Sequence, residues 1–190
     1  MNFSAVILAG GKSSRMGRDK AFLEIGGTTL LARQIGLARE MDAGEIFISG
    51  RADVNYPAFG CQILLDKFPD AGPFAGIERA LDAMKSPVLL VLAVDLPEMS
   101  VGFLRRLAIS SSETSGAIPR ANGNLEPLAA FYPKAAHALA VANLERGIFA
   151  VKEFAEACVR SKLAQFVDLD ASDARRFANW NSPADFSHRT

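Results

Sequence analysis

A glycine-rich turn followed by a cluster of cations is the feature of this sequence that could most directly do chemistry. The turn is Gly10-Gly11, directly after the short apolar run at residues 5–9. Glycine has no Cβ, so its backbone N–H groups can approach an anion closely, and basic side chains supply the countercharge. The segment is therefore typical of a phosphate-binding loop. Its cations are Lys12, Arg15, Arg18 and Lys20.

Counting positions excludes two familiar phosphate-binding loops. A Walker A loop ending in Gly11-Lys12-Ser13 needs glycine at position 6, where this chain has Val6. The dinucleotide pattern GxGxxG meets Lys12 when it starts at Gly10 and Ser13 when it starts at Gly11. Any phosphate site here is of another kind, and a solvated glycine turn with surface cations is the alternative.

Two aspartates follow apolar runs that read as strands. Asp95 follows the longest run, residues 88–94, and Asp66 follows residues 62–65. The carboxyl ends of parallel strands are where α/β sheets ordinarily bind ligands. Mg²⁺ prefers one or two carboxylates together with phosphate oxygens and water, so Asp95 is a candidate metal ligand. The alternatives are a turn or helix-cap role for Asp95 before Pro97, and a plain turn carboxylate for Asp66.

The elements that must position these residues alternate between strand and helix. Continuous apolar runs at 5–9, 45–49, 62–65 and 88–94 are typical of strands covered on both faces. Helical spacing lies between them, first at Leu31, Ile35 and Ala38, then at Ile77, Leu81 and Met84. The order predicts an α/β fold of Rossmann-like type, with a doubly wound, mostly parallel sheet and helices on both faces. Downstream, the pattern predicts helices at 103–107, 136–144 and 151–157, and strands at 128–132 and 163–167.

Composition restricts the class of protein. The 190 residues are about one average domain in length, so we expect a single domain over 1–190. Lys plus Arg and Asp plus Glu each number 21, so no net positive field exists to attract nucleic acid or anionic membranes. The longest apolar run is far shorter than the ~20 residues of a membrane span, and the first residues lack a basic signal-peptide region. We therefore expect a cytoplasmic protein with neither a nucleic-acid nor a membrane partner.

The remaining metal-ligating residue types form no convincing site. The cysteines, Cys61 and Cys158, and the histidines, His137 and His188, have no metal-ligand spacing, and the cysteines suggest no disulfide framework. His137 is expected at the surface or in packing. Asp170-Ala171-Ser172-Asp173, close after Asp168, is more typical of a capped helix start than of a metal cluster.

The glycine-cation segment resembles the opening signature of a nucleotidyltransferase family, LAGG followed by S-x-R-M-G and D-K. That family joins a nucleoside triphosphate to a phosphorylated acceptor. Three further segments are similar to its later motifs, in the same order along the chain. The whole set most resembles the molybdenum cofactor guanylyltransferases, which join GMP to molybdopterin. The segments are Asp66 with Gly72-Pro73-Phe74-Ala75-Gly76, then residues 91–97 ending in Asp95-Leu96-Pro97, then Asn179-Trp180-Asn181-Ser182-Pro183.

The resemblance implies a role for each matching residue. Backbone groups of Leu8, Ala9, Gly10 and Gly11 would contact the nucleotide, which Asp66 would line. Lys20 and Arg15 would stabilise charge growing toward pyrophosphate, and Asp95 would bind Mg²⁺. The amides of Asn179 and Asn181 could hydrogen-bond a pterin or phosphate of the acceptor, although a turn before Pro183 explains them as well. The family often has S-A-N-R where this chain has Ser49-Gly50-Arg51-Ala52, which leaves open any base or ribose contact from that loop.

The expected activity is transfer of GMP from GTP to molybdopterin or molybdenum cofactor, with release of pyrophosphate and with Mg²⁺ as cofactor. Transient contact with other cofactor-biosynthesis proteins is a further expectation. Three alternatives stay open: a related transferase that uses CTP or another phosphorylated acceptor, a nucleotide-binding regulatory module without turnover, and a scaffold for a partner enzyme.

The acceptor role of Asn181 can be tested by Asn181→Ala. Losing one buried amide contact leaves its partner unpaired at a cost of ~1–3 kcal/mol, or roughly 5- to 150-fold in affinity. We expect a higher requirement for molybdopterin while GTP affinity stays within about twofold, measured by titrating each substrate. A lower melting temperature with weaker binding of both ligands would instead show that the segment is a structural turn.

Overall fold

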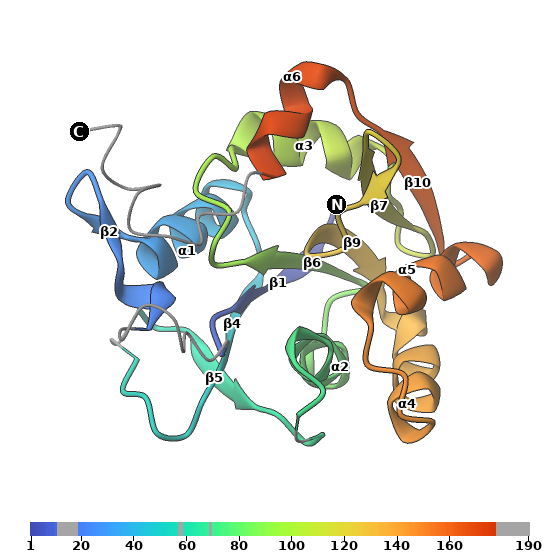
Figure 1. Cartoon of the computed structure of the whole chain (residues 1–190), viewed down its shortest axis with the longest axis horizontal. Coiled ribbons are helices and arrows are strands. Elements are labelled where there is room, and N and C mark those ends of the chain that lie inside the picture. Colours follow the sequence, from blue (N-terminus) through green and yellow to red (C-terminus); the bar gives the residue numbers. More distant parts are fainter. Residues whose placement is uncertain (11–18, 57–58, 69, 178–190) are drawn as a thin grey trace.

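The computed structural model describes residues 1–10, 19–56, 59–68 and 70–177. Its centre is an eight-stranded sheet in the order β10-β7-β9-β6-β1-β4-β5, with β8 paired to β7 (Figure 1). The strands of this sheet are β1 (Phe3–Leu8), β4 (Glu45–Gly50), β5 (Gln62–Leu65), β6 (Val88–Ala93), β7 (Gly116–Ala121), β8 (Asn124–Leu125), β9 (Ala129–Pro133) and β10 (Ala164–Asp168). A separate hairpin is formed by β2 (Glu24–Ile25) and β3 (Thr28–Thr29).

Most of the sheet is parallel. β1 pairs in parallel with both β4 and β6, β4 pairs in parallel with β5, and β10 pairs in parallel with β7. β9 is antiparallel to its neighbours β6 and β7, and β8 is antiparallel to β7. The predicted fold class, a doubly wound and mostly parallel α/β sheet, is confirmed.

Helices cover both faces of the sheet. Figure 1 shows α1 and α3 on one side of the central strands and α2 and α4 on the other. The helices are α1 (Leu30–Glu40), α2 (Pro73–Ala83), α3 (Val101–Ile109), α4 (His137–Glu145), α5 (Val151–Arg160) and α6 (Ala171–Ala174), with short 3₁₀ turns η1 (Lys20–Phe22), η2 (Lys134–Ala136) and η3 (Arg175–Phe177). None of the described helices has the length and apolarity that a bilayer span requires.

The continuous apolar run of β6 is explained by this two-sided cover. All six of its residues are buried. Leu90 and Leu92 belong to the core cluster beneath α1 and α3, whereas Leu89 and Val91 belong to the cluster beneath α2, α4 and α5. Because alternate side chains point to opposite faces, a strand covered on both sides needs an apolar residue at every position.

The observed strands differ from the sequence prediction in two ways. β1 begins at Phe3 rather than at residue 5, because the buried Ser4 hydroxyl donates to Glu45 Oε2 over 2.8 Å and so satisfies its polar group. β7 and the short strands β2, β3 and β8 were not predicted. β7 contains Pro119, which has no N–H to donate and usually marks the edge or end of a strand. Here Pro119 lies opposite Val167 of β10.

Gly76 allows α2 to approach the sheet closely. A Cβ at this position would lie 2.8 Å from Ser49 Cβ and 3.1 Å from Leu8 Cδ2. Both neighbours belong to strands that end at the same edge of the sheet. A larger residue would therefore push α2 away from β1 and β4.

We expect Gly76→Ala to destabilise the protein by ~1–3 kcal/mol, as overpacking of a dense core does. Gly36 provides a matched control, because it lies in α1 and a Cβ there would meet nothing within 4 Å. Gly36→Ala should stabilise the protein by ~0.5–1 kcal/mol through higher helix propensity. Urea unfolding of both variants measures the difference, and shifts of the same sign would contradict this account of Gly76.

Candidate active site

The carboxyl ends of four parallel strands meet at one edge of the sheet. The register places Leu8 beside both Ser49 and Ala93, and Gly50 beside Leu65. β4 and β5 lie on one side of β1, and β6 lies on the other, so the direction of winding reverses between β1 and β6. Such a switch point is where doubly wound sheets form their ligand crevice. The residues that follow β1, β4, β5 and β6 are thus gathered there.

Lys20 and Asp95 form an ion pair at this point. Lys20 Nζ lies 3.4 Å from Asp95 Oδ2, and the two side chains are 23% and 26% exposed. Lys20 opens η1, which is capped by Asp19 Oδ1 accepting from Ala21 N over 3.0 Å. Asp95 follows the end of β6 by two residues. The structure therefore brings together a cation and a carboxylate that the sequence separates by 75 positions, and leaves both partly accessible.

The backbone at the end of β1 is held from both sides. Ala9 N donates to the Ser49 carbonyl over 2.9 Å, and the Leu8 carbonyl accepts from Val94 N over 3.2 Å. The Ala9 N–H is therefore already bonded within the sheet. Leu8 and Ala9 are buried and Gly10 is partly exposed, so the chain emerges from the core at Gly10.

Asp66 lies at the same edge, directly after β5. The residue is exposed overall, but its carboxyl group is partly buried, and this burial raises its pKa above the ordinary value. The negative charge of Glu78 raises the pKa further. Glu78 lies on α2 with its side chain only 3% exposed, and its Oε1 is 2.9 Å from His137 Nε2. Perturbed carboxyl groups of this kind are common at functional sites. His137, expected at the surface or in packing, is the hydrogen-bond partner of a buried acid.

The loop after β4 has Arg51 at the position where the S-A-N-R motif has its asparagine. Arg51 turns toward Asp53, with Nε 2.9 Å from Oδ1, and its backbone N–H donates to Tyr56 Oη over 3.1 Å. Gly50 lies against the same tyrosine, because a Cβ at Gly50 would be 2.8 Å from Tyr56 Cζ. The Arg51 side chain is therefore engaged by Asp53.

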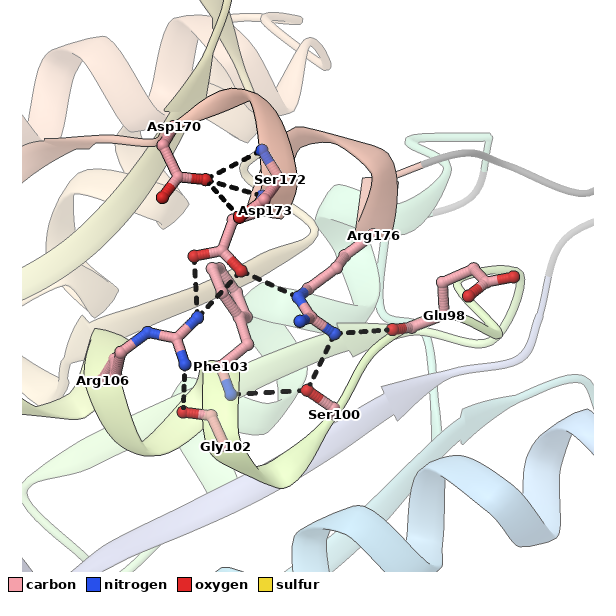
Figure 2. A network of polar contacts seen from close by, with 9 residues as sticks. All are labelled: Glu98, Ser100, Gly102, Phe103, Arg106, Asp170, Ser172, Asp173 and Arg176. Carbon is pink, nitrogen blue, oxygen red and sulfur yellow. Dashed lines mark hydrogen bonds and ion pairs between the residues drawn. The ribbon is translucent and has the colours of Figure 1, made fainter.

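The acidic residues 168–173 include the helix cap that the sequence predicted, and they also form ion pairs that it did not predict. Asp170 Oδ1 accepts from Ser172 N and Asp173 N, both over 2.9 Å, and so caps α6. Asp168 pairs with Arg120, and Asp173 bonds to Arg106 and Arg176 (Figure 2). Burial alone would raise the pKa of Asp173, but the bonds from Arg176 and Arg106 outweigh it and lower that pKa.

In the part of the chain that the structure describes, no group of three or more His, Cys, Asp or Glu side chains could hold a metal.

One residue beside the site was not predicted from the sequence. Gln34 is buried and its Nε2 donates to the carbonyl of Leu96, directly after Asp95. A polar residue within the apolar stripe of Leu31, Ile35 and Ala38 was the signal that could have found it.

Six residues of the predicted site lie outside the described residues, so their roles stay predictions. They are Gly11, Lys12, Arg15, Arg18, Asn179 and Asn181.

Comparison with known proteins gives the family. Residues 5–161 match the model of the MobA-like NTP transferase domain. The chain belongs to this nucleotidyltransferase family. A relative from Opitutus terrae, named "Probable molybdenum cofactor guanylyltransferase", is 38% identical over 185 residues, which are 96% of this chain and 92% of that protein. A relative from Syntrophotalea carbinolica, named "Molybdenum cofactor guanylyltransferase", is 31% identical over 186 residues, or 96% and 88%.

Two solved structures share the fold of this chain. The molybdopterin-guanine dinucleotide biosynthesis protein A of Archaeoglobus fulgidus has a TM-score of 0.75 at 20% identity, covering 96% of this chain and 94% of that one. The 2-C-methyl-D-erythritol 4-phosphate cytidylyltransferase of Thermus thermophilus has a TM-score of 0.74 at 22% identity, covering 98% and 96%. The family predicted from the motifs is confirmed, and so is the architecture that carries them.

The raised pKa of Asp66 makes a prediction about stability. The unfolded carboxylate is ionised at neutral pH, whereas partial burial and the nearby Glu78 charge disfavour the ionised form in the folded state. Asp66→Asn should therefore raise the melting temperature of the unliganded protein at pH ~7. The gain should disappear as the pH falls through the raised folded pKa to the ordinary value of 3.8, because the folded protein then takes up the proton itself.

Glu113→Gln is the control, since Glu113 is exposed and its substitution also removes one negative charge. Thermal unfolding of both variants across this pH range makes the comparison. A gain from Glu113→Gln as large as that from Asp66→Asn would show an effect of net charge instead.

Proposed function

We propose that this protein transfers GMP from GTP to the phosphate of molybdopterin and releases pyrophosphate. The observation that carries the proposal is the Lys20–Asp95 pair at the switch point between β1 and β6. A cation beside a carboxylate at such a switch point suits a nucleoside triphosphate with its metal. The names of the relatives supply the choice of GTP and of the acceptor.

The reaction needs little covalent help from the protein. An oxygen of the acceptor phosphate attacks the α-phosphorus of GTP, and the bond from that phosphorus to the bridging oxygen of the β-phosphate breaks. Pyrophosphate leaves with the bonding electron pair. The second pKa of a phosphate monoester is about 6, so the acceptor is mostly dianionic at neutral pH and attacks without a general base. The protein's part is to align the two substrates and to stabilise the growing charge.

Asp95 fits the role of a magnesium ligand. Its carboxylate lies at the strand edge and is about a quarter exposed. The described residues supply no cage of several acidic ligands, which suits a metal that arrives with the triphosphate and keeps its other positions for phosphate and water. Bound there, Mg²⁺ would neutralise charge on the phosphate oxygens.

Lys20 supplies the complementary charge. Its ammonium group lies beside Asp95 and can donate to a phosphate oxygen that binds at the same point. Arg15 is proposed to share this role, on the strength of its motif. The backbone of Leu8, Ala9, Gly10 and Gly11 is proposed to face the nucleotide, with Asp66 lining it.

The acceptor is proposed to bind through Asn179 and Asn181. The described chain ends at Phe177, whose ring packs edge to face on Phe103 of α3, with 5.5 Å between centroids. The helix α3 begins six residues after Asp95. Phe177 therefore lies beside the element that follows the proposed metal ligand.

Pyrophosphate release with GTP, CTP, ATP or UTP, each with and without molybdopterin, tests the proposal. We expect release only when GTP, molybdopterin and Mg²⁺ are all present. Asp95→Asn should lower the rate by at least ~100-fold, a typical scale for the loss of one electrostatic stabiliser, whereas Asp42→Asn should not. Turnover with CTP would overturn the choice of GTP, and GTP binding without any turnover would indicate a regulatory module.

A further inference from the structure

Three consecutive backbone carbonyls after Asp95 face side chains from distant parts of the chain. Leu96 O accepts from Gln34 Nε2 over 2.8 Å, and Pro97 O accepts from Arg33 Nε over 2.9 Å. Glu98 O accepts from Arg176 Nη1 over 3.5 Å, as Figure 2 shows. We name residues 95–100 the Asp95 loop. Its path is set by α1 on one side and by η3 on the other, not by a regular element of its own.

Gln34 is the only one of these donors that is fully buried, with 0% of its surface exposed. It occupies the apolar face of α1, where a leucine or methionine would bury more favourably. Its Oε1 has no hydrogen-bond partner among the described residues. A buried acceptor without a partner costs free energy.

The bond from Gln34 is not needed to satisfy the Leu96 carbonyl. That oxygen also accepts from Met99 N over 3.2 Å. Removing the glutamine amide would leave the carbonyl paired and would also remove the unpaired Oε1. The Gln34 amide therefore contributes little to the stability of the fold, and its unpaired oxygen lowers that stability. Its role is to fix the position of the Asp95 loop.

The helix α1 is the common support of Lys20 and Asp95. Its first residue, Leu30, donates its N–H to the carbonyl of Leu23, the residue that ends η1, over 2.9 Å. Gln34, one turn later, bonds to the residue directly after Asp95. Hydrogen bonds from α1 therefore hold the backbone next to both members of the ion pair.

We propose that Gln34 is a positioning residue, which orients the Asp95 carboxylate for the metal that accompanies the nucleoside triphosphate. This inference rests on the proposed function. Fixing the Leu96 carbonyl restricts the backbone that carries Asp95. Without that bond, the carboxylate samples other orientations, and the metal-dependent part of nucleotide binding weakens. Nucleotide contacts that do not involve the metal are unaffected.

The test is Gln34→Met, a substitution of similar length without hydrogen-bonding groups. GTP binding is measured by calorimetry in Mg²⁺ and in EDTA. We expect the affinity gained from Mg²⁺ to fall by ~10- to 100-fold, the usual cost of losing a group that orients a metal ligand. Affinity in EDTA should stay within about twofold and the unfolding midpoint should equal or exceed that of the natural protein, because no buried partner is lost.

Two further variants complete the design. Gln165→Met removes a similar bond, from Gln165 Nε2 of β10 to Ser110 O over 2.6 Å. This variant should leave the affinity that GTP gains from Mg²⁺ unchanged. Arg33→Met removes the exposed donor to Pro97 O and should lower the gain in the same direction as Gln34→Met.

An unchanged magnesium gain in Gln34→Met, or a loss equal in Mg²⁺ and EDTA, would overturn the inference. Failure of Gln34→Met to fold would overturn it too, because Gln34 would then be a structural residue. If the natural protein itself gains no GTP affinity from Mg²⁺, the proposed function is at fault and not the role of Gln34.

Discussion

The parallel pairing of β1 with strands on both sides is the constraint on which the site depends. All six residues of β1 are buried, and β4 and β6 flank it in the same direction. Helix α1 covers one face and α2 the other, so the chain must reverse its winding at β1. The carboxyl ends of the strands beside such a reversal are where doubly wound sheets bind their ligands. Lys20 and Asp95 come within 3.4 Å only because the segments after β1 and β6 leave the sheet side by side.

Three buried polar atoms without a hydrogen-bond partner belong to residues near Lys20, Asp95 and Asp66. Among the described residues, these atoms are side-chain oxygens of Asp19, Gln34 and Glu78. Asp19 precedes Lys20, Gln34 bonds to the loop after Asp95, and the Glu78 charge adds to the raised pKa of Asp66. An unsatisfied buried group costs free energy, so each of these atoms lowers the stability of the fold.

A second polar network ties the C-terminal elements to the same loop. Arg176 bonds to Asp173, to Ser100 Oγ over 3.0 Å and to the Glu98 carbonyl, while Asp173 also accepts from Arg106 of α3 (Figure 2). Asp173 is buried and shared by two guanidinium groups, an arrangement that fixes the direction of both arginines. Through Ser100, which caps α3, the network joins the end of the Asp95 loop to η3.

The sequence by itself determined the family, through its motifs, and most of the central strands. Continuous apolar runs, the Gly10 turn and an aspartate after the longest run are local patterns, and local patterns survive without knowledge of the fold. Lys20 and Asp95 could be named for the same reason.

Only the tertiary structure decided which groups meet: that Lys20 pairs with Asp95, that Arg51 turns to Asp53, and that Gln34 holds Leu96. Likewise, Pro119 hides β7 from a local reading, yet pairing with β10 and β9 makes it a strand. The physical reason is that these contacts depend on strand order and register, which are set by the packing of the whole chain and not by any one segment.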